Sequence, residues 1–214
     1  MVFDEAIKKF WKESPNGTVV NFAEGLETQR FRLQKDMAED ALWISIDLPE
    51  AMAAREKFIE PDDKHLHLDV SVLNAGAWMP LVPKDKPVFF TAQGLFMYLE
   101  EEENKYLFQQ LADHFPGATL QFDCISKWFS DKATKGDWKL TRHYTTPKMP
   151  FGVNKPNVQL LFDSWVPGIQ IKQVEMPTDK LDGMLRWIVP LFLSIPYLKR
   201  MQPGFFLRVK FPSK

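Results

Sequence analysis

Two residues, Gly25 and Asp47, have the types and the spacing that suit a nucleotide-binding site. Gly25 follows the apolar run Thr18–Phe22, and Asp47 closes the next apolar run, Leu42–Ile46, 22 positions after the glycine. A glycine lets the backbone approach a ligand closely, and a helix start beyond it offers free N–H groups to an anion. A carboxylate at the end of the second strand can accept hydrogen bonds from both vicinal hydroxyls of a ribose. The spacing therefore predicts a site for an adenosine-containing cofactor, although the three-glycine pattern of dinucleotide-binding proteins is absent.

Strands and helices that alternate along the chain are expected to position these two residues. Apolar runs predict strands over Thr18–Phe22, Leu42–Ile46, His65–Val70, Val88–Ala92, Ala118–Cys124, Ile169–Val174 and Phe205–Phe211. Helical periodicity predicts helices over Phe3–Lys12, Pro49–Phe58, Glu100–Phe115, Val158–Phe162 and the proline-interrupted Leu181–Met201. A further short helix is expected between the Gly25 turn and the strand that begins at Leu42. The segment Asn74–Pro87 is expected to be a loop. This alternation predicts an α/β fold with a mostly parallel sheet.

Three segments resemble motifs of a known family. Val19–Leu33, Ile46–Glu50 and Thr91–Leu99 are similar, in this order, to the first, second and strand-four motifs of the leucine carboxyl methyltransferase family. That family includes the O-methyltransferases of tetracenomycin-type polyketide synthesis. The resemblance covers about Val19–Phe211 and implies one class I S-adenosylmethionine (SAM) methyltransferase domain over residues 1–214. It further implies a three-layer, Rossmann-like α/β fold with a seven-stranded sheet of order 3-2-1-4-5-7-6, mostly parallel, with an antiparallel last strand.

Two features depart from the family pattern. Ala23 stands where the first glycine of the turn is usual, and the lid helices that normally precede the first strand look shortened. Residues 126–156 mix charge, aromatic rings and proline without a clear period, so we expect a lid or insertion there. From these departures we expect this chain to bind SAM weakly alone, and to need a partner subunit or a longer N-terminus for full turnover.

The resemblance implies a SAM site built from residues that follow the first four strands. The turn faces the methionine end of SAM, including the backbone and side chain of Glu24, and Asp47 binds the ribose unless it only caps the following helix. Residues after the third strand contact the adenine, which Trp78 is a candidate to shield. Gln93, where the family usually has an acid, is expected near the cofactor. The implied cofactor-binding residues are Ala23, Glu24, Gly25, Asp47, Leu48, Ser71, Val72 and Gln93.

The implied reaction is methyl transfer from SAM to a carboxylate or hydroxyl of a small, polyketide-like molecule. Tyr98, His143 and Tyr144 are candidates to line the substrate pocket, with ordinary packing as the alternative for each. A carboxylate acceptor is already a nucleophile and needs no base. A phenol or alcohol benefits from one, and His143 or Asp123 is the first residue to test. No catalytic residue is assigned from the sequence.

Composition excludes several other classes. The formal net charge of −1 argues against nucleic-acid binding, and the single cysteine excludes an internal disulfide framework and favours a reducing compartment. His65 and His67 lack further metal-ligand partners at useful spacing, so no metal site is expected. The N-terminus lacks the features of a signal peptide, and the longest uncharged run, Trp187–Leu198, is too short to span a bilayer. We therefore expect a cytoplasmic protein that does not bind membranes, with the segment Trp187–Tyr197 as a candidate surface for a homodimer or else part of the core.

Two alternative functions stay open. The first is a SAM-binding protein that uses a methyltransferase fold without catalysis, which Ala23 and the short N-terminus favour. The second is a nicotinamide-dependent oxidoreductase, which also needs a turn and a ribose-binding acid. The missing second and third glycines and the absence of a Tyr-x-x-x-Lys pair disfavour it.

Overall fold

A seven-stranded sheet forms the centre of the protein. The computed structural model describes residues 2–135, 139–141, 144–145, 147–174 and 204–213. The strands are β1 (Thr18–Phe22), β2 (Leu42–Asp47), β3 (His65–Asp69), β4 (Val88–Ala92), β5 (Thr119–Ile125), β8 (Gln170–Val174) and β9 (Gly204–Lys210). Their order across the sheet is β3-β2-β1-β4-β5-β9-β8, and β9 runs antiparallel to both of its neighbours. The predicted strand order, mostly parallel sheet and antiparallel last strand are therefore confirmed.

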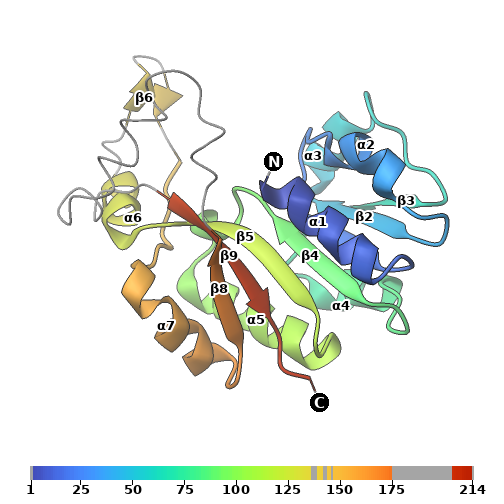
Figure 1. Cartoon of the computed structure of the whole chain (residues 1–214). Helices are drawn as coiled ribbons and strands as arrows, with labels where there is room; N and C mark the ends of the chain where they lie inside the picture. The colour runs from blue at the N-terminus through green and yellow to red at the C-terminus, as the bar shows by residue number, and fades with distance from the viewer. Residues whose placement is uncertain (1, 136–138, 142–143, 146, 175–203, 214) are drawn as a thin grey trace, which may run out of the picture.

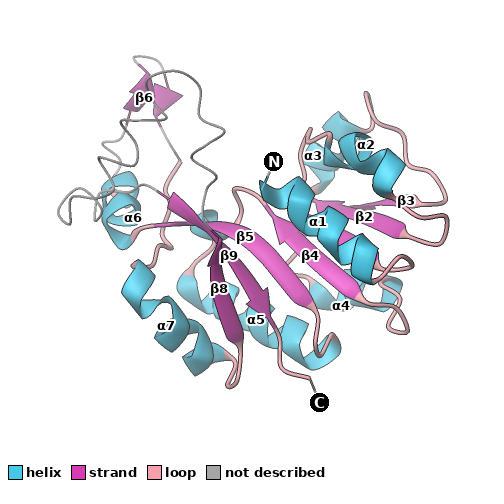
Figure 2. Ribbon diagram, in the orientation of Figure 1, coloured by secondary structure: helices cyan, strands magenta, loops and turns pink. Residues whose placement is uncertain are grey.

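Helices cover both faces of this sheet (Figures 1 and 2). They are α1 (Val2–Glu13), α2 (Gln29–Leu33), α3 (Pro49–Arg55), α4 (Ala75–Trp78), α5 (Glu101–His114), α6 (Lys127–Thr134) and α7 (Val158–Trp165). On one face, residues of α1 and α2 pack with Val19, Trp43 and Phe89. On the other face, α4, α5 and α7 pack against a larger core. Strands β1, β2 and β4 are buried on both faces, which explains their nearly continuous apolar sequences.

Two segments contain helices that the sequence did not predict. Asn74–Pro87, expected to be a loop, includes α4 and a 3-10 helix over Met79–Leu81, because Ala75, Trp78 and Met79 bury apolar side chains in the larger core. The segment 126–156 begins with α6, whose N-cap Ser126 accepts a hydrogen bond from the Phe129 N–H at 3.3 Å. It also contains the short antiparallel pair of β6 (Lys139–Thr141) and β7 (Tyr144–Thr145). A lid role for this segment stays a prediction.

The helical region expected over Leu181–Met201, with its candidate dimer surface Trp187–Tyr197, lies outside the described residues. Among the residues that are described, no helix combines the length and apolarity needed to cross a membrane.

The chain changes direction across the sheet between β1 and β4. After β1 it adds β2 and β3 on one side, and it then returns to add β4 and β5 on the other. In such folds ligands bind outside the carboxyl ends of the strands at this point. The register pairs Phe22, at the end of β1, with Ile46 of β2 and Ala92 of β4. The turns that follow β1, β2 and β4 are therefore neighbours at one edge of the sheet.

Candidate cofactor site

The turn after β1 contacts the carboxylate that ends β2. The backbone N–H of Gly25 donates a hydrogen bond of 2.7 Å to Asp47 Oδ2, and the N–H of Leu48 donates one of 2.8 Å to Asp47 Oδ1. Leu48, and not Asp47, is the N-cap residue of α3, and no side chain caps that helix. The capping interpretation of Asp47 is therefore wrong. Its carboxylate joins the two turns and lies half-buried at the edge where the fold binds ligands.

The turn adopts a left-handed backbone at two positions. Ala23 has φ of 50° and Gly25 has φ of 53°. This conformation costs little for glycine but roughly 1–2 kcal/mol for a residue with a Cβ. A Cβ added at Gly25 would meet no heavy atom within 4 Å, so the glycine borders open space. The turn therefore leaves room for a ligand above Gly25 and stores strain at Ala23.

The Glu24 side chain is buried beneath the turn. It forms an ion pair with Arg55 Nη2 at 3.2 Å and accepts hydrogen bonds from Trp43 Nε1, at 3.2 Å, and from the Ser45 hydroxyl. Burial raises the pKa of Glu24, and the charge of Arg55 and these hydrogen bonds oppose the rise. The expectation that this side chain faces the cofactor is therefore wrong, because its carboxylate is buried in an ion pair with the Arg55 guanidinium. Only the Glu24 backbone remains at the turn.

Two histidines on β3 adjoin this buried cluster. His65 Nε2 lies 2.8 Å from Ser45 Oγ, and His67 Nδ1 lies 3.3 Å from Glu56 Oε1. Burial, helped by the positive charges around it, lowers the pKa of His65 to about 3, so the ring stays neutral. Burial also lowers the pKa of His67, against the opposing effect of Glu56. Within the described ranges, no three His, Cys, Asp or Glu side chains gather as metal ligands.

The predicted adenine-side residues follow β3. Ser71 is half-buried and its hydroxyl accepts a hydrogen bond from the Leu73 N–H at 3.3 Å. Val72 is buried, and its carbonyl accepts a 2.9 Å bond from the Trp78 indole N–H. Trp78 itself is fully buried against Phe22. The expectation that Trp78 shields adenine does not match this geometry, because the ring lies in the core. From there its indole N–H bonds the backbone of the segment that follows β3.

A second glycine turn follows β4. Gly94 has φ of 69° and donates a 2.7 Å hydrogen bond from its N–H to Asp123 Oδ1 on β5. Burial raises the pKa of Asp123, and the bond from Gly94 opposes this. Gln93, just before this glycine, is half-buried, and its amide makes no hydrogen bond to any described residue. The Asp123 carboxylate therefore meets the turn after β4, and Gln93 belongs to that turn, at the same edge of the sheet as Asp47.

The structure places the candidate substrate residues only in part. Tyr98 lies on a 3-10 helix after β4 and is 43% exposed. Tyr144 belongs to β7 in backbone, but its side chain and the whole of His143 lie outside the described residues. Cys124 is buried and burial raises the pKa of its thiol to about 12, which agrees with its interpretation as a small core residue.

Sequence reasoning missed Arg55, which contacts the turn directly. Its Nη1 donates hydrogen bonds to the carbonyl oxygens of Gly25, at 2.8 Å, and Glu27, at 2.9 Å. In the sequence, a basic residue in the last turn of a helix is ordinary, since it complements the helix dipole. The available signal was its position three residues after the buried Met52, which places Arg55 on the inner face of α3.

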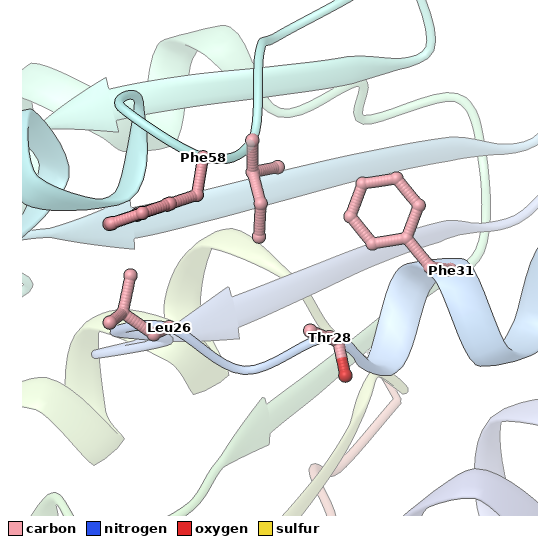
Figure 3. A pocket seen from close by; sticks show the side chains of 5 residues that line it. Leu26, Thr28, Phe31 and Phe58 are labelled. Carbon is pink, nitrogen blue, oxygen red and sulfur yellow. The ribbon is translucent and has the colours of Figure 1, made fainter.

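A groove of about 470 Å³ lies between the segment that follows the turn and the segment that follows α3 (Figure 3). Its lining residues are Leu26, Thr28, Phe31, Phe58 and Ile59. Phe58 is 78% exposed and Leu26 is 58% exposed. The turn is therefore weakly packed on this side, and its main fixed contacts come from Asp47 and Arg55.

Solved structures define the class of fold. A SAM-dependent methyltransferase of Clostridium acetobutylicum matches with a TM-score of 0.61 at 10% identity, over 99% of this chain and 92% of that protein. A SAM-dependent methyltransferase of Anabaena variabilis matches with a TM-score of 0.58 at 14% identity, over 99% of this chain and 86% of that protein. With the strand order described above, the chain has the class I methyltransferase fold.

Sequence relatives point the same way, although no family profile matches the chain. The chain is 25% identical over 201 residues to the tetracenomycin polyketide synthesis O-methyltransferase TcmP of Streptomyces glaucescens, covering 92% of this chain and 71% of TcmP. It is 28% identical over 120 residues to the SAM-dependent methyltransferase dpfgK of Gibberella zeae, covering 53% of this chain and 40% of that relative. The chain is thus a homologue of SAM-dependent methyltransferases.

Proposed function

We propose that this chain binds SAM and transfers its methyl group to an oxygen of a small molecule. The proposal rests mainly on the hydrogen bond between Gly25 and Asp47, which lies where the chain changes direction across the sheet. The similarity to TcmP, an O-methyltransferase by name, supports oxygen as the acceptor and a polyketide-like molecule as the substrate.

The chemistry of the site fits SAM. An ionised carboxylate has about four lone-pair positions, and Gly25 and Leu48 use two of them at Asp47. The remaining positions can accept bonds from two ribose hydroxyls. The open space beside Gly25 leaves room for the cofactor to approach the backbone. The Gln93 amide, just after the neighbouring strand β4, can both donate and accept hydrogen bonds.

SAM, when bound, supplies a methyl group activated by a positively charged sulfonium. The task of the protein is then to hold the acceptor oxygen in line with that methyl group and to exclude water. A carboxylate acceptor needs nothing further from the chain. For a hydroxyl acceptor, Asp123 is the described residue best suited to take the proton, because it lies beside the turn after β4 and is half-buried.

A SAM-binding protein without transferase activity is the second candidate. Ala23 favours it, because a side chain in a left-handed turn narrows the space that glycine leaves in the resembled family.

Calorimetry with SAM, S-adenosylhomocysteine and NAD tests the binding part of the proposal. We expect SAM and its product to bind and NAD not to bind; binding of NAD alone would favour the oxidoreductase alternative. Methyl transfer is then measured by mass spectrometry on matched acids and phenols, namely benzoate with phenol and 1-naphthoate with 1-naphthol. Binding of SAM without transfer to any acceptor would favour the non-catalytic candidate.

A further inference from the structure

Arg55 holds the carbonyl side of the turn after β1. It is the last residue of α3, and its side chain is 0% exposed. Its Nη1 donates to the carbonyl oxygens of both Gly25 and Glu27, and its Nη2 pairs with Glu24. One guanidinium therefore contacts three of the four residues from 24 to 27.

Gly25 is held on both sides by the same β2–α3 unit. Asp47, at the end of β2, accepts from the Gly25 N–H at 2.7 Å, and Arg55, at the end of α3, donates to the Gly25 carbonyl at 2.8 Å. A turn with two left-handed residues persists only when its surroundings over-determine it. Leu26 and Thr28, just after the glycine, line the open groove of Figure 3, so the hydrogen bonds to Asp47 and Arg55 are the main contacts that fix the turn.

Glu24, which forms the ion pair with Arg55, is itself held by hydrogen bonds. Glu24 is hydrogen-bonded by Trp43 and Ser45, and Ser45 is bonded in turn to His65. The planar guanidinium presents several donors in a rigid fork, which lets it reach two carbonyls and a carboxylate at once. A lysine has the charge but not this geometry.

We propose that Arg55 is a positioning residue for the cofactor site, which fixes the Gly25 turn so that the open side of Gly25 and the Asp47 carboxylate meet SAM together. This inference rests on the proposed function. A purely structural ion pair between Arg55 and Glu24 is the competing explanation, and the two differ in which substitution weakens cofactor binding.

Three variants separate the explanations. Glu24→Gln removes the ion pair but leaves the bonds from Arg55 to the two carbonyls. Arg55→Lys keeps the charge and loses the fork. The double variant Glu24→Gln/Arg55→Gln removes the fork without leaving an unpaired buried carboxylate. Arg30→Lys is the matched control, because Arg30 is a buried arginine on neighbouring α2 whose guanidinium bonds Asp62 at 2.8 Å, away from the Gly25 carbonyl that Arg55 holds.

The first measurement is the SAM dissociation constant by calorimetry, at a temperature where circular dichroism shows every variant folded. We expect Arg55→Lys and the double variant to weaken SAM binding at least tenfold, and Glu24→Gln to weaken it less than Arg55→Lys does, because the two bonds from Arg55 to the carbonyl oxygens remain. Arg30→Lys should change it less than threefold. In turnover, the KM for SAM should rise in Arg55→Lys while kcat stays within about threefold. Equal SAM affinity in Arg55→Lys and the parent, or equal losses in Arg55→Lys and Arg30→Lys, would overturn the proposal.

Amide hydrogen exchange without cofactor gives an independent measurement. We expect at least tenfold faster exchange at Gly25 and Glu27 in Arg55→Lys and not in Arg30→Lys. Unchanged exchange at these amides would also overturn the proposal. If the parent chain binds no SAM, the proposed function fails, and the exchange result still decides whether Arg55 fixes the turn.

Discussion

The Gly94 N–H lies 2.7 Å from Asp123 Oδ1, the same distance that joins the Gly25 N–H to Asp47 Oδ2. Each glycine has a positive φ and follows one of the adjacent strands β1 and β4, and each carboxylate belongs to the strand on the far side of that strand, β2 or β5. The edge of the sheet thus carries two glycine–carboxylate pairs, one on either side of the point where the chain changes direction. We expect Asp47 to serve the cofactor and Asp123 to serve the methyl acceptor.

The Asp123→Asn substitution tests that division. For hydroxyl acceptors we expect kcat to fall roughly 10²–10⁴-fold, the usual effect of a lost general base, while SAM affinity stays within threefold. Because burial raises the pKa of Asp123, the parent rate with a phenol should fall as the pH decreases through that raised pKa, when the carboxylate takes up a proton. The pH profile of kcat in both proteins measures this. An unchanged profile in Asp123→Asn would exclude Asp123 as the base.

The Asp47→Ala substitution tests the ribose assignment. Loss of charge-assisted hydrogen bonds worth about 1.5–3 kcal/mol should weaken SAM binding tenfold or more. Calorimetry provides the measurement, and Asp113→Ala, at an exposed position of α5, is the control with no expected effect. If a folded Asp47→Ala protein bound SAM as the parent does, Asp47 would not contact the ribose.

The Ala23→Gly substitution should stabilise the protein. Glycine relieves the left-handed strain at φ of 50°, so we expect the free energy of unfolding to rise by about 1 kcal/mol and SAM binding to be retained or improved. Ala54→Gly on the exposed side of α3 is the control, and it should lower the free energy of unfolding by about 1 kcal/mol. Denaturant titration distinguishes the two signs, and a destabilised Ala23→Gly protein would contradict the strain argument.

His65 should make the protein sensitive to acid. Burial lowers the pKa of His65 from its ordinary value of 6.5 to about 3, so below pH 6.5 the unfolded chain takes up a proton that the folded protein does not. Above pH 6.5 the histidine is neutral in both states and does not lower the free energy of unfolding. As the pH falls from 6.5 toward 3, proton uptake by the unfolded chain lowers the free energy of unfolding by up to about 1.4 kcal/mol per pH unit. In His65→Gln the free energy of unfolding should fall less steeply over that range. A slope as steep as that of the control His114→Gln, at an exposed position, would contradict this.

The Trp78→Phe substitution tests the core position of the ring. It removes the donor to the buried Val72 carbonyl, so we expect the free energy of unfolding to fall by about 1–3 kcal/mol. SAM affinity should change less than threefold, because the ring is fully buried. The opposite result, a tenfold loss of affinity with unchanged stability, would restore the role of Trp78 beside adenine.

Much of the fold was predictable because it depends on local patterns. The apolar runs at Thr18–Phe22 and Val88–Ala92 match β1 and β4 residue for residue, since strands buried on both faces need unbroken apolar sequence. The strand order came from the family resemblance. The helix α4 was missed because its residues become helical only by burying Ala75 and Trp78 in the core.

The candidate site, too, was predictable from the sequence only in part. From the sequence came Gly25 and Asp47, because covalent spacing between successive strands determines which turn and which strand end can meet. Only the tertiary structure decided that Glu24 points inward to Arg55 and that Asp123 meets Gly94. Those contacts depend on which strands lie side by side and which face of a helix is buried, and the hydrogen bonds that result have no periodicity in the sequence.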